Sequence, residues 1–196
     1  MISFWYNLII KMIKTNGDEI MKQRIKKWEI IGVFIIFALC FPLHYGYEKT
    51  ENTLLALVCP VNESIWEHAR MGFYAVLIYA VVEYFLIGKE YKNFWYGKLK
   101  AVYIMPITII MLYYTYTGII GKHFIWMDIG IAFIGAILAQ YISYSTIISS
   151  KDFKKRQSLS LVFIVIGIIV FTVFVFNPPK LPLFFDKKAN QYGIPL

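Results

Sequence analysis

The residues best suited to chemistry stand in one short run, from Cys59 to Arg70, which reads Cys-Pro-Val-Asn-Glu-Ser-Ile-Trp-Glu-His-Ala-Arg. The run contains an amide, two carboxylates, a hydroxyl, an imidazole and a guanidinium. The segment that follows, from Met71 to Ile87, is nearly all apolar. Polar groups at the start of an apolar membrane helix are energetically costly unless they cap the helix, are hydrated or have a function. We therefore take this run as the first candidate for a functional site.

Helical spacing groups several of these side chains, because residues three or four apart lie on one face of a helix. Ser64, Glu67 and His68 then point in one direction. We expect His44, from the end of the preceding span, and Asp128, from the start of a later span, to converge with them. Two imidazoles with carboxylates form a ligand set that suits zinc or another divalent transition metal. Zinc with an open coordination position would activate water for hydrolysis.

For such a hydrolytic site the catalytic candidates are Glu63, Ser64 and Glu67. A serine nucleophile with His68 as its base is a weaker interpretation, since no nucleophile elbow surrounds Ser64. Helix capping is the competing explanation of the same residues. Ser64-x-x-Glu67 has the form of a capping box, an acid in the first turn is favoured by the helix dipole, and Glu67 can pair with Arg70. Capping alone predicts that the hydroxyl and the carboxylate bond backbone amides and that the other ligands point elsewhere.

The composition places these residues in a membrane protein. The chain has 196 residues, of which 59% are hydrophobic and only 16% are charged, and its mean hydropathy is +0.58. A soluble domain carries about 25% charged residues. The apolar residues form runs near the length of about 20 residues that a helix needs to cross a bilayer. The fold class is therefore all-α, a polytopic bundle of five transmembrane helices whose partner is the lipid bilayer.

The five spans follow from these runs and from their polar boundaries. Pro42 and the polar residues after it should end the first span, and Pro106 should kink the third. The segment 51–58 is too short to cross and should form a surface helix or a re-entrant one. The expected spans are 28–43 (or 28–47), the polar run to 88, 101–121, 129–148 and 159–176.

Positive charges indicate the orientation of the spans. From residue 21 onwards, twelve Lys and Arg residues precede the first span or follow the second and fourth spans, whereas only Lys49 and Lys122 lie in the loops of the opposite side. This pattern predicts an N-terminus inside, a C-terminus outside and a multi-pass protein of the cell membrane. The net charge of +8 therefore reflects topology rather than nucleic-acid binding. All the unusual polar motifs then face the outside.

The two ends of the chain differ from the membrane domain at residues 21–177. Met21 begins a basic segment with the form of a natural start, so we expect residues 1–20 to be a dispensable extension; an interfacial helix is the alternative. The tail at residues 178–196 is rich in proline and too apolar for a solvated terminus. It should fold back over the outer face, as a lid on the site or as an anchor in the headgroups.

Several motifs resemble a known family. Pro60-Val61-Asn62-Glu63-Ser64-x-Trp66-Glu67-His68 is similar to the signature of DUF6512, an uncharacterised family of bacterial membrane proteins. The resemblance continues through His44, the segment Tyr114–Gly121, Asp128 and the tail sequence Asn-Pro-Pro-x-x-Pro-Leu-Phe-x-Asp at residues 177–186. It departs near Lys187, where Lys-Lys-Ala-Asn replaces the expected turn. The family has no established activity, so the resemblance supports the fold and the choice of motifs only.

Other polar residues of the spans have structural explanations. We expect Gln140, Ser143 and Tyr144 to form interhelical hydrogen bonds. Glu83 should reach the interface or pair with a lysine of the following loop. Cys40 and Cys59 have no metal-type spacing and are expected to be free buried thiols, with a disulfide as the alternative.

The leading functional interpretation is an integral membrane protein with a polar site that opens to the outer face. It would act as a metal-dependent, hydrolase-like enzyme on a lipid or a small envelope molecule, with zinc or another divalent metal as its cofactor. The alternatives are a protein that binds or transports a small solute or ion, and a non-catalytic membrane partner subunit. A transporter requires a polar path that continues to the inside.

Overall fold

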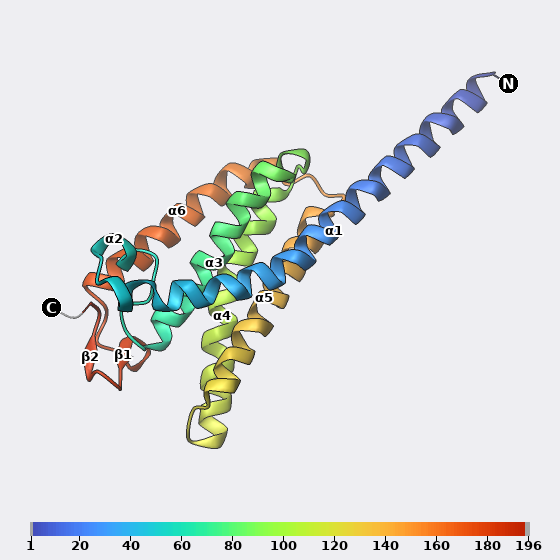
Figure 1. The fold of residues 1–196 in the computed structure, drawn as a ribbon. Helices are drawn as coiled ribbons and strands as arrows, with labels where there is room; N and C mark the ends of the chain where they lie inside the picture. The colour runs from blue at the N-terminus through green and yellow to red at the C-terminus, as the bar shows by residue number, and fades with distance from the viewer. Residues whose placement is uncertain (1, 195–196) are drawn as a thin grey trace.

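The computed structural model describes the backbone of residues 2–194 and the side chains of residues 15–153 and 155–194. Helices make up almost all of the described chain (Figure 1). The helices are α1 (Ile2–Thr50), α2 (Thr53–Ala56), α3 (Ile65–Leu86), α4 (Phe94–Ile120), α5 (Ile125–Ile147) and α6 (Lys154–Phe176). Two short 3-10 helices, η1 (Gly88–Glu90) and η2 (Pro182–Phe184), and the two-residue strands β1 (Phe185–Asp186) and β2 (Gln191–Tyr192) complete the fold.

The prediction of five membrane-spanning helices is confirmed. Five helices are long and apolar enough to cross a bilayer: residues 15–50 of α1, together with α3, α4, α5 and α6. The outward surface of α6 is apolar along its length, with exposed Leu159, Val165, Ile169 and Val173. Such a surface suits lipid chains rather than water. The segment between α1 and α3 holds only the short helix α2, as expected of a segment that cannot cross.

The predicted end of the first span is wrong. Pro42 lies inside α1, and the helix continues to Thr50. Proline removes one backbone hydrogen bond and crowds the preceding turn, but a long helix with other contacts tolerates this cost. Because the helix continues, His44 belongs to the last two turns of α1 rather than to a loop.

The helices pack as neighbours around α4 and α3. Helix α4 contacts α3, α5 and α6, and helix α1 contacts α3 and α5. Small and apolar residues fill the centre, among them Phe73, Val76, Val102 and Met105, all fully buried. Helices α1 and α3 run antiparallel. Late residues of α1 contact early residues of α3 at one end of the pair, and early residues of α1 lie beside late residues of α3 at the other end.

This antiparallel pair places polar groups at both of its ends. At one end His44 of α1 meets His68 of α3. Fifteen residues away along each helix, Glu29 of α1 and Glu83 of α3 both pair with Lys98 of α4. A separation of fifteen residues corresponds to about 22 Å of helix. In the part of the chain that the structure describes, the α1–α3 pair therefore carries a polar site at each end, with apolar packing between them.

Candidate metal centre

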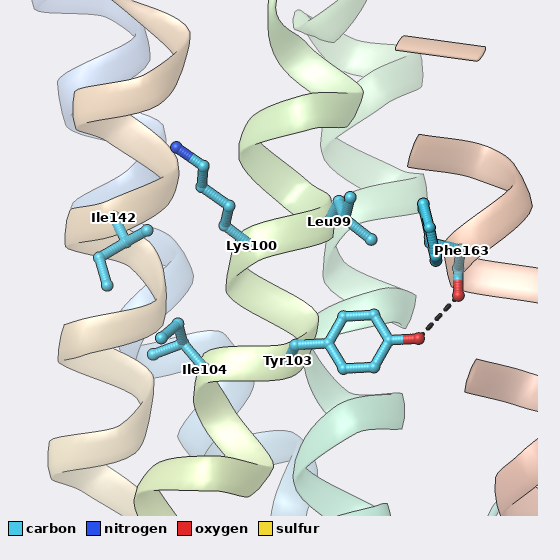
Figure 2. A pocket seen from close by; sticks show the side chains of 6 residues that line it. All are labelled: Leu99, Lys100, Tyr103, Ile104, Ile142 and Phe163. Atoms are coloured by element: carbon cyan, nitrogen blue, oxygen red, sulfur yellow. Dashed lines mark hydrogen bonds between the residues drawn. The ribbon is translucent and has the colours of Figure 1, made fainter. Parts of the chain in front are cut away.

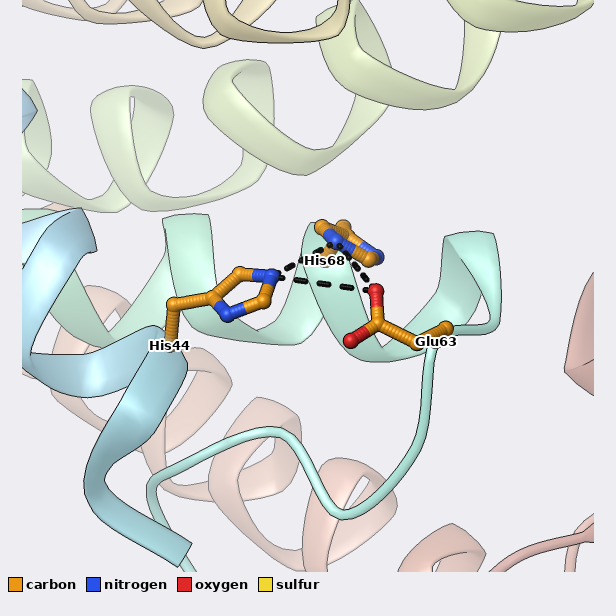
Figure 3. Close-up of side chains that lie close together, drawn as sticks. All are labelled: His44, Glu63 and His68. Carbon is orange, nitrogen blue, oxygen red and sulfur yellow. Dashed lines mark hydrogen bonds and ion pairs between the residues drawn. The ribbon is translucent and has the colours of Figure 1, made fainter. Parts of the chain in front are cut away.

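His44, His68 and Glu63 bring three potential metal ligands to one point (Figure 3). His44 comes from α1, His68 from the first turns of α3, and Glu63 from the loop just before α3. The Nε2 atoms of the two histidines are 3.2 Å apart. Oε2 of Glu63 lies 3.8 Å from Nε2 of His44 and 3.6 Å from Nε2 of His68. Among the described residues, these three form the group whose ligand atoms converge.

The three separations fit a single metal ion. A point equidistant from three atoms at these separations lies about 2.1 Å from each of them, which matches the usual distances of zinc to imidazole nitrogen and carboxylate oxygen. The carboxylate oxygen is too far from either nitrogen for a good hydrogen bond. The two Nε2 atoms are within hydrogen-bonding distance of each other, so a metal ion at the common centre would replace a bond between the imidazoles.

His68 is held in the tautomer that a metal requires. Its Nδ1 lies 2.9 Å from the backbone carbonyl of Ser64, so Nδ1 carries the proton and donates it to that carbonyl. The lone pair of the neutral ring is then on Nε2, which faces His44 and Glu63. A hydrogen bond from the second ring nitrogen to a backbone carbonyl is the usual support of a histidine ligand. Nδ1 of His44 is buried and has no partner.

Glu63 is positioned by the C-terminal tail. Its backbone N–H donates to Oδ2 of Asp186 at 2.9 Å, and Asp186 is almost fully buried. The neighbouring side chain, Asn62, donates to the backbone carbonyl of Gly193 at 2.9 Å. The loop before α3 is therefore tied to the hairpin of β1 and β2 at two adjacent residues.

The tail also packs on the start of α3 through aromatic side chains. The ring of Trp66 lies 4.6 Å from that of Phe184 and 4.8 Å from that of Phe171, between centroids. Gly193 has a φ of +65°, and an added Cβ would lie 2.7 Å from the carbonyl oxygen of Val175. Only glycine fits here, because a side chain would be strained and would clash with the end of α6.

Ser64 and Glu67 have capping and anchoring roles in this arrangement. The hydroxyl of Ser64 accepts from the backbone N–H of Glu67. The Glu67 carboxylate accepts from the backbone N–H of Val61 at 3.0 Å and pairs with Arg70. Glu67 is thus bonded away from the two histidines. The expected pairing with Arg70 is confirmed, and only the serine half of the capping box forms.

Arg70 holds the loop before α3 against the helix. Its guanidinium is fully buried and donates to the backbone carbonyls of Ala56 and Cys59 as well as to Glu67. Burial raises the pKa of the neighbouring Cys59 thiol, although the Arg70 charge opposes this rise. Cys40 and Cys59 are free and buried, as expected. The loop that carries Glu63 is therefore fixed at both ends, by Arg70 and by the tail.

Asp128 lies apart from the histidine pair. It follows the turn between α4 and α5, which Figure 1 shows well away from the ends of α1 and α6. Its carboxylate accepts a hydrogen bond from the hydroxyl of Tyr116 and lies 3.2 Å from Nδ1 of His123. Of the predicted metal ligands, His44 and His68 come together, whereas Glu67 and Asp128 do not join them and Glu63 takes the carboxylate position.

The comparisons agree with the resemblance in the sequence. The model of DUF6512, described as a family of unknown function, matches residues 18–194. The chain belongs to DUF6512. No curated protein and no solved structure matches the chain.

Two of the segments on which the resemblance to DUF6512 rests are in contact in this chain. The first contains Asn62, Glu63 and Trp66, and the second contains Phe184 and Asp186; the bonds and ring contacts described above join them. The residues near Lys187 that depart from the family pattern form the turn of the hairpin between β1 and β2. Oδ1 of Asp186 accepts from the backbone N–H of Lys188 at 2.7 Å and of Ala189 at 3.1 Å, which closes the turn.

The sequence predicts only part of a second polar cluster. Glu83 pairs with Lys98, a lysine that follows its span, as one of the two expected arrangements required. The sequence assigns no role to Glu29 and indicates only a topology charge for Lys98, whereas both are buried in the structure. Gln140 donates to the backbone carbonyl of Glu29, and Ser143 donates to its carboxylate, so their predicted interhelical bonds are confirmed. Acidic residues inside two apolar spans were the available signal.

A shallow groove of about 390 Å³ lies elsewhere on the bundle, between α4, α5 and α6 (Figure 2). It shares no residue with the histidine cluster. Its polar groups are already bonded, because the Tyr103 hydroxyl donates to the carbonyl of Phe163 and Lys100 donates to Thr146. Lipid chains would fill such a groove on spanning helices. The lining residues are Leu99, Lys100, Tyr103, Ile104, Ile142 and Phe163.

Proposed function

We propose that this DUF6512 protein is a metal-dependent membrane enzyme of the hydrolase type. His44, His68 and Glu63 would hold one divalent transition metal, with zinc as the best match. Two imidazoles and one carboxylate with a fourth position open are the ligand set of several catalytic zinc sites. The observation that carries the proposal is the single point about 2.1 Å from all three ligand atoms, the distance that zinc prefers.

The exposure of the ligands supports a catalytic rather than a closed site. The side chain of Glu63 is 41% exposed and that of each histidine is 26% exposed. A structural zinc site has four protein ligands and is closed to solvent, whereas a catalytic one keeps a position for water or substrate. The metal would supply an acidified water at this position. The protein would hold the three ligands and their tautomers in place.

The position of the site suggests the class of substrate. It lies where α1 ends and α3 begins, at the end of the spans and beside the apolar tail. By the charge pattern this end faces outward from the cell membrane of a bacterium. A lipid headgroup or a small molecule of the cell envelope would reach such a site from the membrane surface. Glu48, four residues after His44 on the same face of α1, is the candidate for a proton acceptor.

A transport protein is the second candidate, and the packing argues against it. Beyond the site, the buried residues of α1 and α3 are mostly apolar, including Ile36, Cys40, Phe73 and Val76. Between the histidine site and the cluster of Glu29 and Glu83, about 22 Å of helix away, an ion would meet mostly apolar side chains along this contact. Binding and chemistry at one end of the bundle therefore account better for these residues than passage through it.

The test is a search for metal-dependent hydrolysis. Zinc-loaded protein in detergent would be incubated with a lipid extract of bacterial envelopes, and the products would be followed by mass spectrometry. We expect one class of lipid or envelope molecule to be cleaved, with at least a 100-fold loss in Glu63→Gln and His68→Ala, since an enzyme of this type depends on its metal. His123→Ala, which lies outside the site, is the matched control. Equal cleavage by all variants, or none by any, would contradict the proposal.

A further inference from the structure

A buried charge cluster lies at the other end of the α1–α3 pair. Glu29 of α1, Glu83 of α3 and Lys98 of α4 have exposed fractions of 3%, 0% and 0%. Nζ of Lys98 lies 3.0 Å from Oε1 of Glu29 and pairs also with Oε2 of Glu83. The cluster is thus built from three spanning helices and is closed to solvent.

The charges of this cluster do not balance. Two carboxylates face one ammonium, which leaves one negative charge in excess when all three groups are ionised. Among the described residues, Tyr79 of α3 and Gln140 and Ser143 of α5 face the cluster, and Tyr91 interacts electrostatically with Glu83. None of these groups carries a positive charge. A buried carboxylate without a counter-charge is strongly disfavoured in an apolar interior and takes up a proton instead.

The hydrogen bonds of the cluster also indicate that the two carboxylates need a further proton donor. Lys98 is fully engaged, because its ammonium contacts both carboxylates and lies over the rings of Tyr79 and Phe94, 5.6 and 5.2 Å from their centroids. Ser143 donates to Oε1 of Glu29 at 2.6 Å. Four buried acceptor atoms nevertheless have no hydrogen-bond partner: Oε2 of Glu29, Oε1 and Oε2 of Glu83, and Oε1 of Gln140, although Oε2 of Glu83 forms an ion pair with Lys98. The cluster therefore lacks a donor, and buried polar atoms of native proteins rarely lack one.

The backbone is shaped to bring Gln140 into this cluster. Gly32 lies one turn after Glu29 in α1, and a Cβ there would be 2.1 Å from Nε2 of Gln140 and 2.5 Å from Cε1 of Tyr79. Without a side chain at this position, Gln140 reaches the backbone carbonyl of Glu29 at 3.3 Å. The polar groups of four helices therefore meet here because Gly32 of α1 has no side chain to keep them apart.

We propose that Glu29, Glu83 and Lys98 form a proton-binding site that holds one exchangeable proton on the pair of carboxylates. The ligand is a proton rather than a metal cation, because the Lys98 ammonium already occupies the position between the carboxylates. Glu83 lies three residues before the end of α3, near the connection to α4, so the proton exchanges with water at that end of the bundle. This site is independent of the histidine centre, from which apolar packing separates it.

Infrared spectroscopy of the purified full chain tests the proposal, because a protonated carboxyl has a C=O stretching band that an ionised carboxylate lacks. We expect this band at neutral pH, sensitive to exchange into heavy water. Glu83→Gln and Glu29→Gln should each lose it, since the remaining carboxylate is neutralised by Lys98. Glu90→Gln, which removes an exposed carboxylate that pairs with Arg24, is the matched control and should keep the band.

Each result decides the proposal. Absence of the band in the unchanged protein, or its persistence in both glutamine variants, would overturn it. A band that appears only when sodium is withdrawn would identify a metal cation and would overturn it as well. Lys98→Met should raise the band about twofold, because two protons are then needed. If that variant does not fold, Glu83→Gln still decides, because an amide has the shape of a protonated carboxyl and should preserve the thermal midpoint.

Discussion

The backbone N–H of Glu63 donates a hydrogen bond of 2.9 Å to the carboxylate of Asp186, which lies 123 positions later in the chain. This bond joins the loop before α3 to the C-terminal hairpin. It sets the position of a residue that lies outside the helix and has no helical neighbours to hold it. The tail is therefore a support of the candidate metal centre, held by specific bonds, in addition to covering the end of the bundle.

Asp186→Ala should weaken metal binding without removing a ligand. The change leaves the N–H groups of Glu63, Lys188 and Ala189 without their acceptor, so Glu63 loses its fixed position. Supports of this kind typically change metal affinity by about 10- to 100-fold, and we expect a loss in that range. Zinc affinity measured by competition with a chelator checks it. Lys187→Ala, on the exposed side of the same turn, should bind zinc like the unchanged protein, and equal affinities for both variants would contradict this role of Asp186.

Arg70→Met should destabilise the protein strongly. It removes the partner of the buried Glu67 and the donor to two loop carbonyls. Breaking a buried ion pair by removing one partner typically costs about 3–5 kcal/mol. Unfolding in detergent by heat or denaturant measures the loss.

The double variant Glu67→Gln/Arg70→Met separates charge from packing. It should recover part of the stability, because the unpaired buried carboxylate is gone. A single variant as stable as the unchanged protein would show that the pair does not anchor the loop.

The sequence predicted the five spans and the convergence of His44 with His68, but it placed Glu67 and Asp128 beside them, where the structure has Glu63. Apolar runs and loop lengths place the ends of α1 and α3 at the same level, which suffices for the two histidines. The helical spacing rule favoured Glu67, whereas Glu63 precedes the N-cap Ser64 and follows no helical rule. Its place depends on Asp186, and a bond across so many residues leaves no periodic signal. Asp128 was expected beside the histidines because its span begins at the same depth in the membrane. Equal depth does not bring two residues together when their helices are not neighbours at that end.

The buried cluster of Glu29, Glu83 and Lys98 was hidden for a related reason. A lysine close to the end of a span looks like a topology charge until the helix that carries it is known to begin earlier. Helix α4 begins at Phe94, so Lys98 lies inside it and faces the core. The equal spacing of fifteen residues from Glu29 to His44 and from His68 to Glu83 would have predicted both pairs, given that α1 and α3 are antiparallel neighbours.

Deletion of residues 1–20 should leave insertion and folding intact. The side chains of residues 15–20 are exposed, and the first buried side chain among the described residues of α1 is Ile25. The match to DUF6512 also begins only at residue 18. The yield of monodisperse protein from membranes and its thermal midpoint check this prediction. Loss of folded protein on deletion, with normal yield of the full chain, would show that the extension is structural.

Cysteine reporters should reveal an N-terminus inside and a C-terminus outside. Single cysteines at Lys92 and Asp152, both exposed in loops on the lysine-rich side, should be protected from impermeant thiol reagents in intact cells. A cysteine at Lys187 in the hairpin should react. The native Cys40 and Cys59 are buried and give a low background. The opposite labelling pattern would reverse the orientation and place the candidate metal centre on the inner side.

Titration of metal-free protein with zinc tests the central claim most directly. The unchanged protein should bind one zinc ion per chain, with binding that weakens as acid protonates the imidazole ligands. His44→Ala, His68→Ala and Glu63→Gln should each lower the affinity by at least about 100-fold, because each removes one of three ligands. His123→Ala, which lies outside the site, should retain binding at the same stoichiometry. Absence of stoichiometric binding in a folded, unchanged protein, or binding that survives all three ligand substitutions, would contradict the account.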